Sequence, residues 1–214
     1  MGEAKRKREM LRAEMIRKTR EWMEPPSAEE AELAERILRL EPKKVRRLDR
    51  EQIAWMRMPA NHCHANVGWY VKNDPTGESK HISGWLLEWP DATLHSVLGR
   101  DGEYMCITPT PFGDQWINFI PDGHIEWKET GDVYSPFRDD RPIPSRVRRF
   151  PEFTIARSEF VIRRLESGTN PYDAINIPMS DFGTMIAEHV PPEFWPENMR
   201  LESPSADSDA EQAA

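Results

Sequence analysis

The sequence predicts an α+β protein in which a small antiparallel sheet packs on a cysteine-bearing helix, with a helical N-terminal arm and C-terminal helices. Three observations carry this prediction. Residues 1–58 contain helical patterns, residues 81–127 contain short β-branched and aromatic runs, and residues 151–189 are helical again. The turns between the short runs leave no room for crossover helices, so the strands are expected to pair antiparallel.

The composition indicates a dense core with solvated ends. The 214 residues are 31% charged and have a mean hydropathy of −0.74, yet they include eight Trp and eight Phe. A disordered chain is usually poor in aromatic residues. Residues 1–20 carry a net charge of +5 and residues 59–214 a net charge of −12. The acidic body argues against nucleic-acid binding, whereas the basic head could contact RNA, a membrane surface or the acidic body, or form a solvated helix face.

The chain is expected to reside in the cytoplasm, without a membrane anchor. No run of 18 apolar residues occurs, and the basic N-terminus is not followed by the apolar segment of a signal peptide. Two cysteines do not form a secreted disulfide scaffold. A reducing compartment would leave both thiols free for chemistry.

Residues 1–58 are predicted to form an arm of three helices, because three helical patterns each carry their own start or stop signal. Their apolar residues are expected to be core. Glu24-Pro25-Pro26 ends the first helix, which covers residues 3–23, and a capping box of Ser27 and Glu30 begins the second. A box of Asp49 and Gln52 begins the third helix, which carries Trp55 and Met56 and stops at Pro59.

Residues 59–130 are expected to form the α+β core. Asn61 is a suitable N-cap, which places Cys63 in the first turn of a helix that runs to about Asn73. Five strands follow, separated by turn residues, and residues 131–150 form an irregular connector rich in Pro, Arg and Asp. The predicted strands are 81–89, 93–98, 103–108, 116–120 and 124–127.

Residues 151–200 are predicted to hold helices that pack on the core. Pro151 opens one helix that Gly168 closes, and a shorter helix covers residues 180–189. Residues 201–214 are mainly Ser, Ala, Asp, Glu and Gln, so they are expected to form a disordered acidic tail.

Cys63 and His95 are the strongest candidates for chemistry. A thiol in the first turn of a helix lies near the positive end of the helix dipole, which favours thiolate. Asn66 shares the helix face of Cys63 and could orient a base or donate to an oxyanion. If residues 99–102 form a four-residue turn, His95 lies opposite Cys106. An acid would stand at that position in a catalytic triad.

The motifs around these residues are Cys63-His64-Ala65-Asn66, Gly84-Trp85, His95-Ser96-Val97, Gly102 and Cys106-Ile107-Thr108-Pro109. Over about residues 61–122 they resemble small, largely uncharacterised bacterial and phage-borne proteins, whose core is similar to the transglutaminase-like branch of the papain-type thiol enzymes. The resemblance implies Cys63 as nucleophile and His95 as general base. It places Cys106 where those enzymes carry an acid or amide. Other candidates for that orienting group are Asp114, Asn118 and Asp122.

The predicted function is thiol-dependent hydrolysis or acyl transfer at a peptide, isopeptide or amide bond, with a protein or peptide substrate and no cofactor. The alternative is a non-catalytic protein-interaction module on a degenerate cysteine-enzyme scaffold, with the basic arm and the apolar-striped helices as its contact surface. Two further possibilities stay open. Zinc could bind Cys63, His95, Cys106 and either His62 or His64, although their spacing matches no zinc finger. Cys63 and Cys106 could also form a disulfide that switches the site off.

Overall fold

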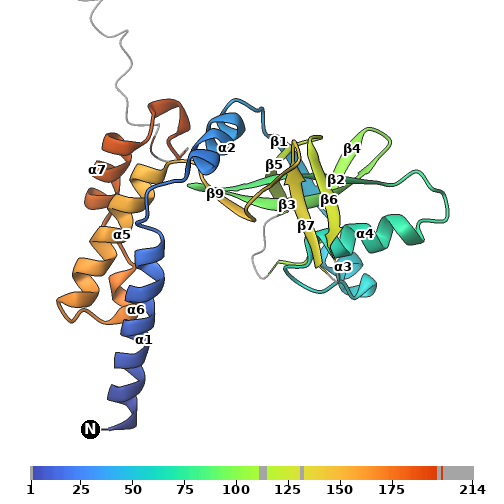
Figure 1. Cartoon of the computed structure of the whole chain (residues 1–214). Helices are drawn as coiled ribbons and strands as arrows, with labels where there is room; N and C mark the ends of the chain where they lie inside the picture. Colours follow the sequence, from blue (N-terminus) through green and yellow to red (C-terminus); the bar gives the residue numbers. More distant parts are fainter. Residues whose placement is uncertain (1, 111–114, 131–132, 197–198, 200–214) are drawn as a thin grey trace, which may run out of the picture. The chain divides into compact units, whose positions relative to one another are not determined.

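The computed structural model describes residues 2–110, 115–130, 133–196 and 199, with the side chains of 129, 130 and 133 left aside (Figure 1). The protein is mixed α+β, as predicted at that level. It divides into two compact units, one made of Met1–Pro25 with Phe150–Ala214 and the other of Pro26–Arg149. The predicted tail of residues 201–214 lies outside the described residues.

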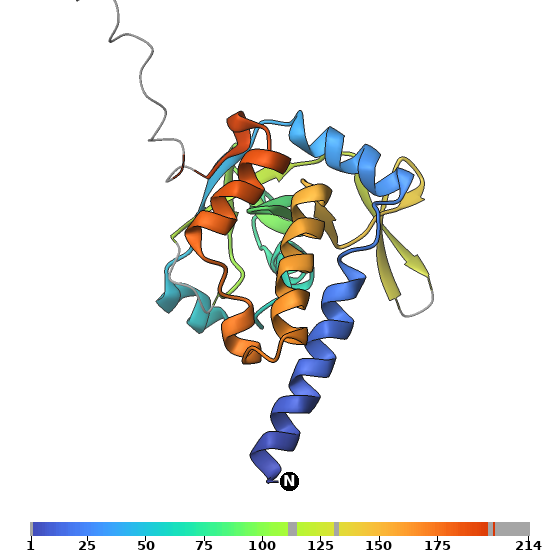
Figure 2. The same cartoon turned by 90° about the vertical axis from the view of Figure 1, so that its left-hand side faces the viewer.

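The first unit is helical, and it joins the two ends of the sequence. Helices α1 and α5 lie side by side (Figure 2), and Met15 and Ile16 pack against Val161 and Leu165. Helices predicted at residues 3–23, from Pro151 and at 180–189 are all present. The described part of the unit also contains two further short helices. The bounds of these five helices are α1 Glu3–Glu21, α5 Pro151–Glu166, α6 Pro171–Ala174, α7 Met179–His189 and the 3-10 helix η1 Pro192–Phe194.

The second unit is built on a closed five-stranded barrel, so the prediction of a small antiparallel sheet is wrong. The strands follow the order β2-β5-β1-β4-β3, and β3 pairs with β2 again, which closes the ring. Four of the pairings are antiparallel and β1–β4 is parallel. The strands are β1 Lys43–Arg47, β2 Lys80–Glu88, β3 Asp91–Arg100, β4 Glu103–Cys106 and β5 Trp116–Pro121.

Strand β1 explains the difference, because it lies inside the segment predicted to be a purely helical arm. Its sequence is Lys-Lys-Val-Arg-Arg, and only Val45 is buried. Lys and Arg have little preference for strands, so the segment gives a weak strand signal. In the barrel Val45 pairs with Ile117 of β5, while Arg46 pairs with Met105 of β4. This one short strand fills the gap between β4 and β5.

A second sheet and a sixth strand of the first sheet, outside the closed ring, occupy the segment predicted as an irregular connector, so that prediction is also wrong. The sheet has the order β6-β7-β8, and β9 pairs with β3. Pro136 and Pro142 lie within strands β7 and β8, where proline normally counts against strand structure. The bounds are β6 Ile125–Thr130, β7 Val133–Arg138, β8 Arg141–Pro142 and β9 Arg146–Arg148.

The β3–β4 hairpin has a tighter turn than predicted. Asp101 and Gly102 have φ values of 53° and 81°, and Leu98 pairs with Met105. Positive φ at two central residues is typical of a two-residue type I′ turn. The predicted four-residue turn, which would pair Leu98 with Glu103, is therefore wrong by two residues.

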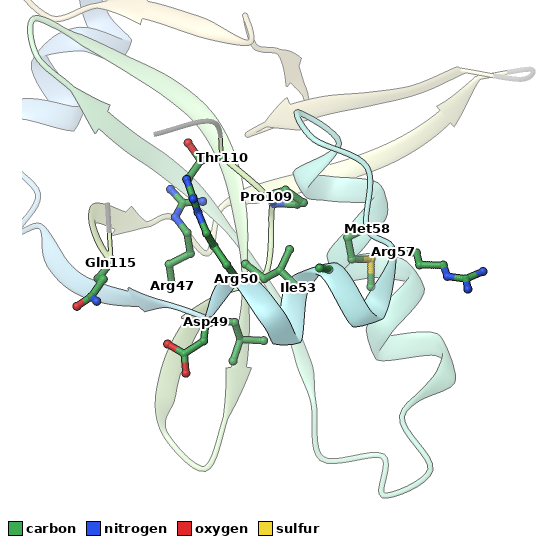
Figure 3. Close-up of a pocket in the computed structure, with 11 residues that line it drawn as sticks. Arg47, Asp49, Arg50, Ile53, Arg57, Met58, Pro109, Thr110 and Gln115 are labelled. Atoms are coloured by element: carbon green, nitrogen blue, oxygen red, sulfur yellow. The ribbon is translucent and has the colours of Figure 1, made fainter. Parts of the chain in front are cut away.

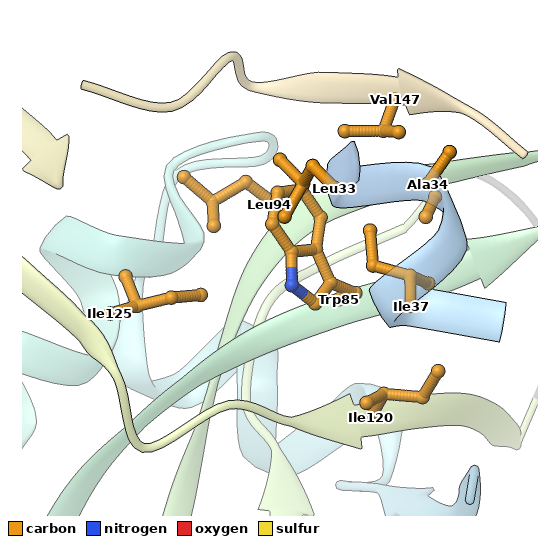
Figure 4. Packing of buried hydrophobic residues seen from close by; sticks show 9 residues of the cluster. Leu33, Ala34, Ile37, Trp85, Leu94, Ile120, Ile125 and Val147 are labelled. Atoms are coloured by element: carbon orange, nitrogen blue, oxygen red, sulfur yellow. The ribbon is translucent and has the colours of Figure 1, made fainter. Parts of the chain in front are cut away.

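Helix α2, Ala28–Leu38, covers one outer part of the barrel. Ser27 caps it by accepting a hydrogen bond from the Glu30 backbone N–H at 3.1 Å, which is one of the two bonds of the predicted capping box. The Glu30 carboxylate also accepts hydrogen bonds from Arg148 of β9, from Nη2 at 2.6 Å and from Nε at 2.8 Å. Figure 4 shows Leu33 and Ile37 against the buried Trp85 indole. The cluster contains Leu33, Ala34, Ile37, Trp85, Ala92, Leu94, Ile120, Ile125 and Val147.

Helices α3, Arg50–Met56, and α4, Cys63–Asn73, cover another outer part of the barrel. Val67 of α4 packs with Leu98 of β3 and Ile107. Successive side chains of a strand point to opposite faces. The even-numbered residues around Leu98 therefore face α4, whereas Val97 packs with Cys106 and Phe119 in the barrel interior.

Candidate functional site

Cys63 lies in the first turn of α4, as the sequence predicted, but its thiol is not activated there. The N-cap is His62 rather than Asn61, and the Cys63 side chain is buried at 8% exposure. Burial raises the pKa of the Cys63 thiol, although the adjacent backbone of Ser96 and His64 favours the thiolate. Desolvation therefore outweighs the helix N-terminus, and the thiol is neutral at physiological pH.

His95 contacts the other cysteine. Its Nε2 lies 3.4 Å from the Cys106 sulfur, and both residues are buried. The observed register would place Val97 directly opposite Cys106, so His95 reaches the sulfur as a diagonal neighbour across the hairpin. The predicted pair therefore forms through a different register. Burial lowers the pKa of His95 to about 3, with smaller contributions from His64 and Arg47, so the imidazole is neutral.

Arg47 of β1 completes this contact, and the sequence analysis missed it. Its Nη1 donates to the Thr108 carbonyl at 2.6 Å and lies 3.4 Å from the Cys106 sulfur. The cation favours the Cys106 thiolate, but burial is the larger influence and raises the pKa of this thiol above its usual value. Arg47 could be placed beside Cys106 only by recognising the parallel β1–β4 pairing, which joins Arg47 to Cys106.

The structure does not join the predicted catalytic pair by a hydrogen bond. Among the described residues, Cys63 and His95 form no hydrogen bond, and the imidazole is bonded to Cys106 instead. Since Ser96 and Leu98 share the α4-facing side of β3, His95 points to the opposite face, into the barrel. The backbone of β3 therefore separates the helix that carries Cys63 from the imidazole.

The other predicted site residues have structural partners. Asn66 is buried and its Nδ2 donates to the Pro59 carbonyl at 2.9 Å, which ties the preceding loop to α4. Asp122 accepts hydrogen bonds from Trp85 Nε1 at 3.3 Å and Arg138 Nε at 3.0 Å. The remaining two candidates for an orienting group are Asn118, which is exposed on β5, and Asp114, which lies outside the described residues.

A cluster of two histidines and one serine lies on the α4-facing side of the barrel wall. The buried Ser96 Oγ is 2.6 Å from His64 Nδ1 and 2.7 Å from His81 Nε2. A hydroxyl has one proton, so Ser96 donates to one ring and accepts from the other. Burial, followed by His81, lowers the pKa of His64 to about 4, and burial lowers the pKa of His81. The sequence showed both histidines, but the β2–β3 register is needed to bring His81 to Ser96, and the packing of α4 on β3 is needed to bring His64 there.

The described residues hold no assembled metal site, and both cysteines are free thiols. No group of three or more His, Cys, Asp and Glu side chains is arranged to hold a metal ion in those ranges. The zinc set proposed from the sequence is therefore not gathered there. Cys63 and Cys106 are both free thiols, and their disulfide under oxidation stays a prediction.

One hollow adjoins the Cys106 region and is positively charged. It has a volume of about 700 Å³ and lies between α3 and the segment after Cys106. In Figure 3 the side chains of Arg47 and Arg50 extend toward Thr110, whereas Arg57 points away. Ile53 and Met58 supply apolar lining. Arg47 links this hollow to the cysteine region, since it lines the hollow and lies 3.4 Å from the Cys106 sulfur.

A second hollow, here called the tryptophan hollow, has a volume of about 780 Å³ and exposes two indoles. Trp55 is 85% exposed and Trp69 is 58% exposed. Trp55 was predicted to be core, and that prediction is wrong. The hollow is lined by Leu48, by Glu51, Gln52, Trp55 and Met56 of α3, by Trp69 and Tyr70 of α4, and by Leu98, Arg100, Asp101, Glu103 and Met105 of the β3–β4 hairpin.

A scan against protein-family models and searches of curated proteins and of solved structures found no match. The resemblance to transglutaminase-like thiol enzymes therefore stays a prediction. Within the described ranges, every helix is too short or too polar to cross a membrane.

Proposed function

We propose that this protein is a non-catalytic interaction module that binds a segment of a partner protein in the tryptophan hollow. The observation that carries this proposal is the exposure of Trp55 and Trp69 in one hollow. Leaving a large apolar side chain in water forgoes about 1.5–3 kcal/mol of burial free energy. Exposed apolar hollows rimmed by polar residues are typical of interaction sites, and Trp is enriched among the residues that dominate binding.

The cysteine and histidine region supports the same proposal. A thiol nucleophile needs an accessible sulfur and a base that can take its proton near neutral pH. Cys63 is buried with a raised pKa, and His95 is held neutral with its Nε2 on Cys106. These groups act as buried structural residues, with His95 and Cys106 inside the barrel and Cys63 on the helix that covers it.

Thiol-dependent hydrolysis or acyl transfer on a protein or peptide is the second candidate. It is favoured by the position of Cys63 at the start of α4, where the Ser96 and His64 backbone favours the thiolate. In that mechanism Cys63 would attack the carbonyl carbon and His95 would accept the thiol proton. Asn66 or the Cys63 N–H would stabilise the oxyanion. A catalytic Cys63 would require a free thiol, so this candidate places the chain in a reducing compartment such as the cytoplasm.

Alkylation by iodoacetamide separates the two candidates. With the native protein at pH 7.5, we expect Cys63 and Cys106 to react at least about tenfold more slowly than in the urea-unfolded chain, because the buried neutral thiols are poor nucleophiles. Peptide mass spectrometry measures each cysteine separately. Rapid labelling of native Cys63 that is slowed by His95→Gln would contradict the interaction module and favour the enzyme.

A further inference from the structure

We infer that the tryptophan hollow selects a cationic partner segment, one that presents a lysine or arginine side chain between apolar neighbours. This inference rests on the proposed function and names the chemistry of the partner. It follows from the charge of the rim, the aromatic walls and the apolar floor of the hollow.

The rim of the hollow carries an excess of negative charge. Glu51, Asp101 and Glu103 line it together with one cation, Arg100. Arg100 is already neutralised, since its Nη2 lies 2.9 Å from Glu78 and its Nε lies 3.8 Å from Asp101. Within the part of the chain that the structure describes, Glu51 and Glu103 form no ion pair. These two carboxylates are free to receive a cation, and they disfavour nucleic acid and phosphorylated segments.

The walls suit the same ligand. Indole faces attract ammonium and guanidinium groups more strongly than the other aromatic rings do, and Trp55 and Trp69 are both accessible. Leu98, Met56 and Met105 supply apolar lining below them. Methionine side chains adapt to partners of different shape. The hollow therefore offers cation contacts at the rim and apolar contacts for the residues on either side of the cation.

The arginine-lined hollow on the other side of α3 provides a contrast within the same unit. It carries Arg47 and Arg50, so its charge is opposite to that of the tryptophan hollow, although Leu48 lines both. An acidic peptide would be attracted there instead. Dependence on Trp69 therefore identifies which hollow a peptide occupies.

Selection from a phage library of random 12-residue peptides against the full chain tests the inference. We expect the selected peptides to be enriched in Lys and Arg over Asp and Glu. By fluorescence anisotropy, their Kd should rise about tenfold or more in Trp69→Ala and Trp55→Ala, as hot-spot truncation predicts. It should rise about threefold or more in the double variant Glu51→Gln/Glu103→Gln, and binding should weaken with added salt.

Two matched control substitutions lie in the same barrel unit as the hollow. Trp116→Ala removes another exposed indole, and Glu41→Gln removes another exposed carboxylate; neither residue lines the hollow. We expect both variants to bind within about twofold of the wild type, because surface changes away from the contact are nearly neutral.

The possible failures are distinguishable. If no selected peptide depends on Trp69, the proposed function fails, and this inference fails with it. If Trp69-dependent peptides are neutral or acidic, the charge selection is wrong while the interaction module stands. Basic peptides that bind equally well to the Glu51→Gln/Glu103→Gln variant would also overturn the inference, since the carboxylates would then play no part.

Discussion

Replacing Gly84 by alanine is expected to destabilise the barrel unit by about 3 kcal/mol or more, at the upper end of the range for overpacked cores. A Cβ at this position would lie 2.0 Å from the Ile120 carbonyl oxygen and 2.7 Å from Phe119 Cζ. Gly84 pairs with His95 on one side and Pro121 on the other. The added methyl group would therefore push β5 away from β2, at a contact that closes the barrel.

Urea unfolding of Gly84→Ala measures this effect, and Gly68→Ala is its matched control. Gly68 lies within α4, where a Cβ would meet its nearest atom, His81 Nδ1, at 3.9 Å. Because glycine weakens a helix interior, we expect Gly68→Ala to raise the free energy of unfolding by about 0.5–1 kcal/mol. Equal stability of the two variants would show that β2 and β5 do not approach as closely as described.

Acidification from pH 7 to pH 5 is expected to lower the free energy of unfolding by about 2 kcal/mol each for His95 and His64, which stay neutral in the folded state. The pKa values of His95 and His64 are lowered to about 3 and about 4, and that of His81 is also lowered. The stabilisation from keeping these histidines neutral is fully present above the pKa of an unfolded histidine, about 6.5. It is lost as the pH falls, because the unfolded chain binds the protons first.

Urea titrations at half-unit pH intervals between 7 and 5 measure this loss. His64→Gln keeps a polar side chain beside Ser96 but removes one titrating group, so its stability should depend less steeply on pH than that of the wild type. Ion-paired carboxylates such as Glu30, whose pKa is lowered by Arg148, change the stability mainly below pH 5, so they do not account for a loss between pH 7 and pH 5. A wild-type stability that is constant from pH 7 to pH 5 would contradict neutral burial of these histidines.

Local features of the fold were predictable because their signals lie within a few residues of one another. The Ser27 side-chain cap, a helix with Cys63 in its first turn and the Pro151 start of α5 all occur as expected, although α4 begins one residue later than predicted. Asp49 begins α3, but its side chain lies 3.4 Å from Arg46 Nη2 and does not cap the helix. The helix start was therefore right while the capping bond was not.

Closure of the barrel was not predictable from local patterns. Strand β1 has one buried side chain, Val45, and it pairs in parallel with a strand that lies almost 60 residues further along the chain. Nothing near Lys43 indicates such a partner. The exposure of Trp55 has the same cause, since a helical pattern shows which residues share a face but not whether another element covers it.

The candidate site was predictable in its members but not in its electrostatics. His95 does meet Cys106, and Asn66 does share a face with Cys63. The helix N-terminus suggested an activated thiol, whereas burial raises the pKa of Cys63. Desolvation depends on the whole surrounding structure, so a prediction from the local pattern overestimates how far the helix dipole lowers the thiol pKa.

The protonation of His95 tests most directly whether this region is structural or catalytic. A titration of histidine-labelled protein by NMR, from pH 8 to the acid limit of folding, measures the pKa of each imidazole. We expect His95 to stay neutral down to at least pH 5, because burial lowers its pKa to about 3. A His95 pKa between 6 and 8 that shifts on Cys63→Ser would show an imidazole coupled to that thiol, and would contradict the proposal that the cysteine region is an inert part of the barrel.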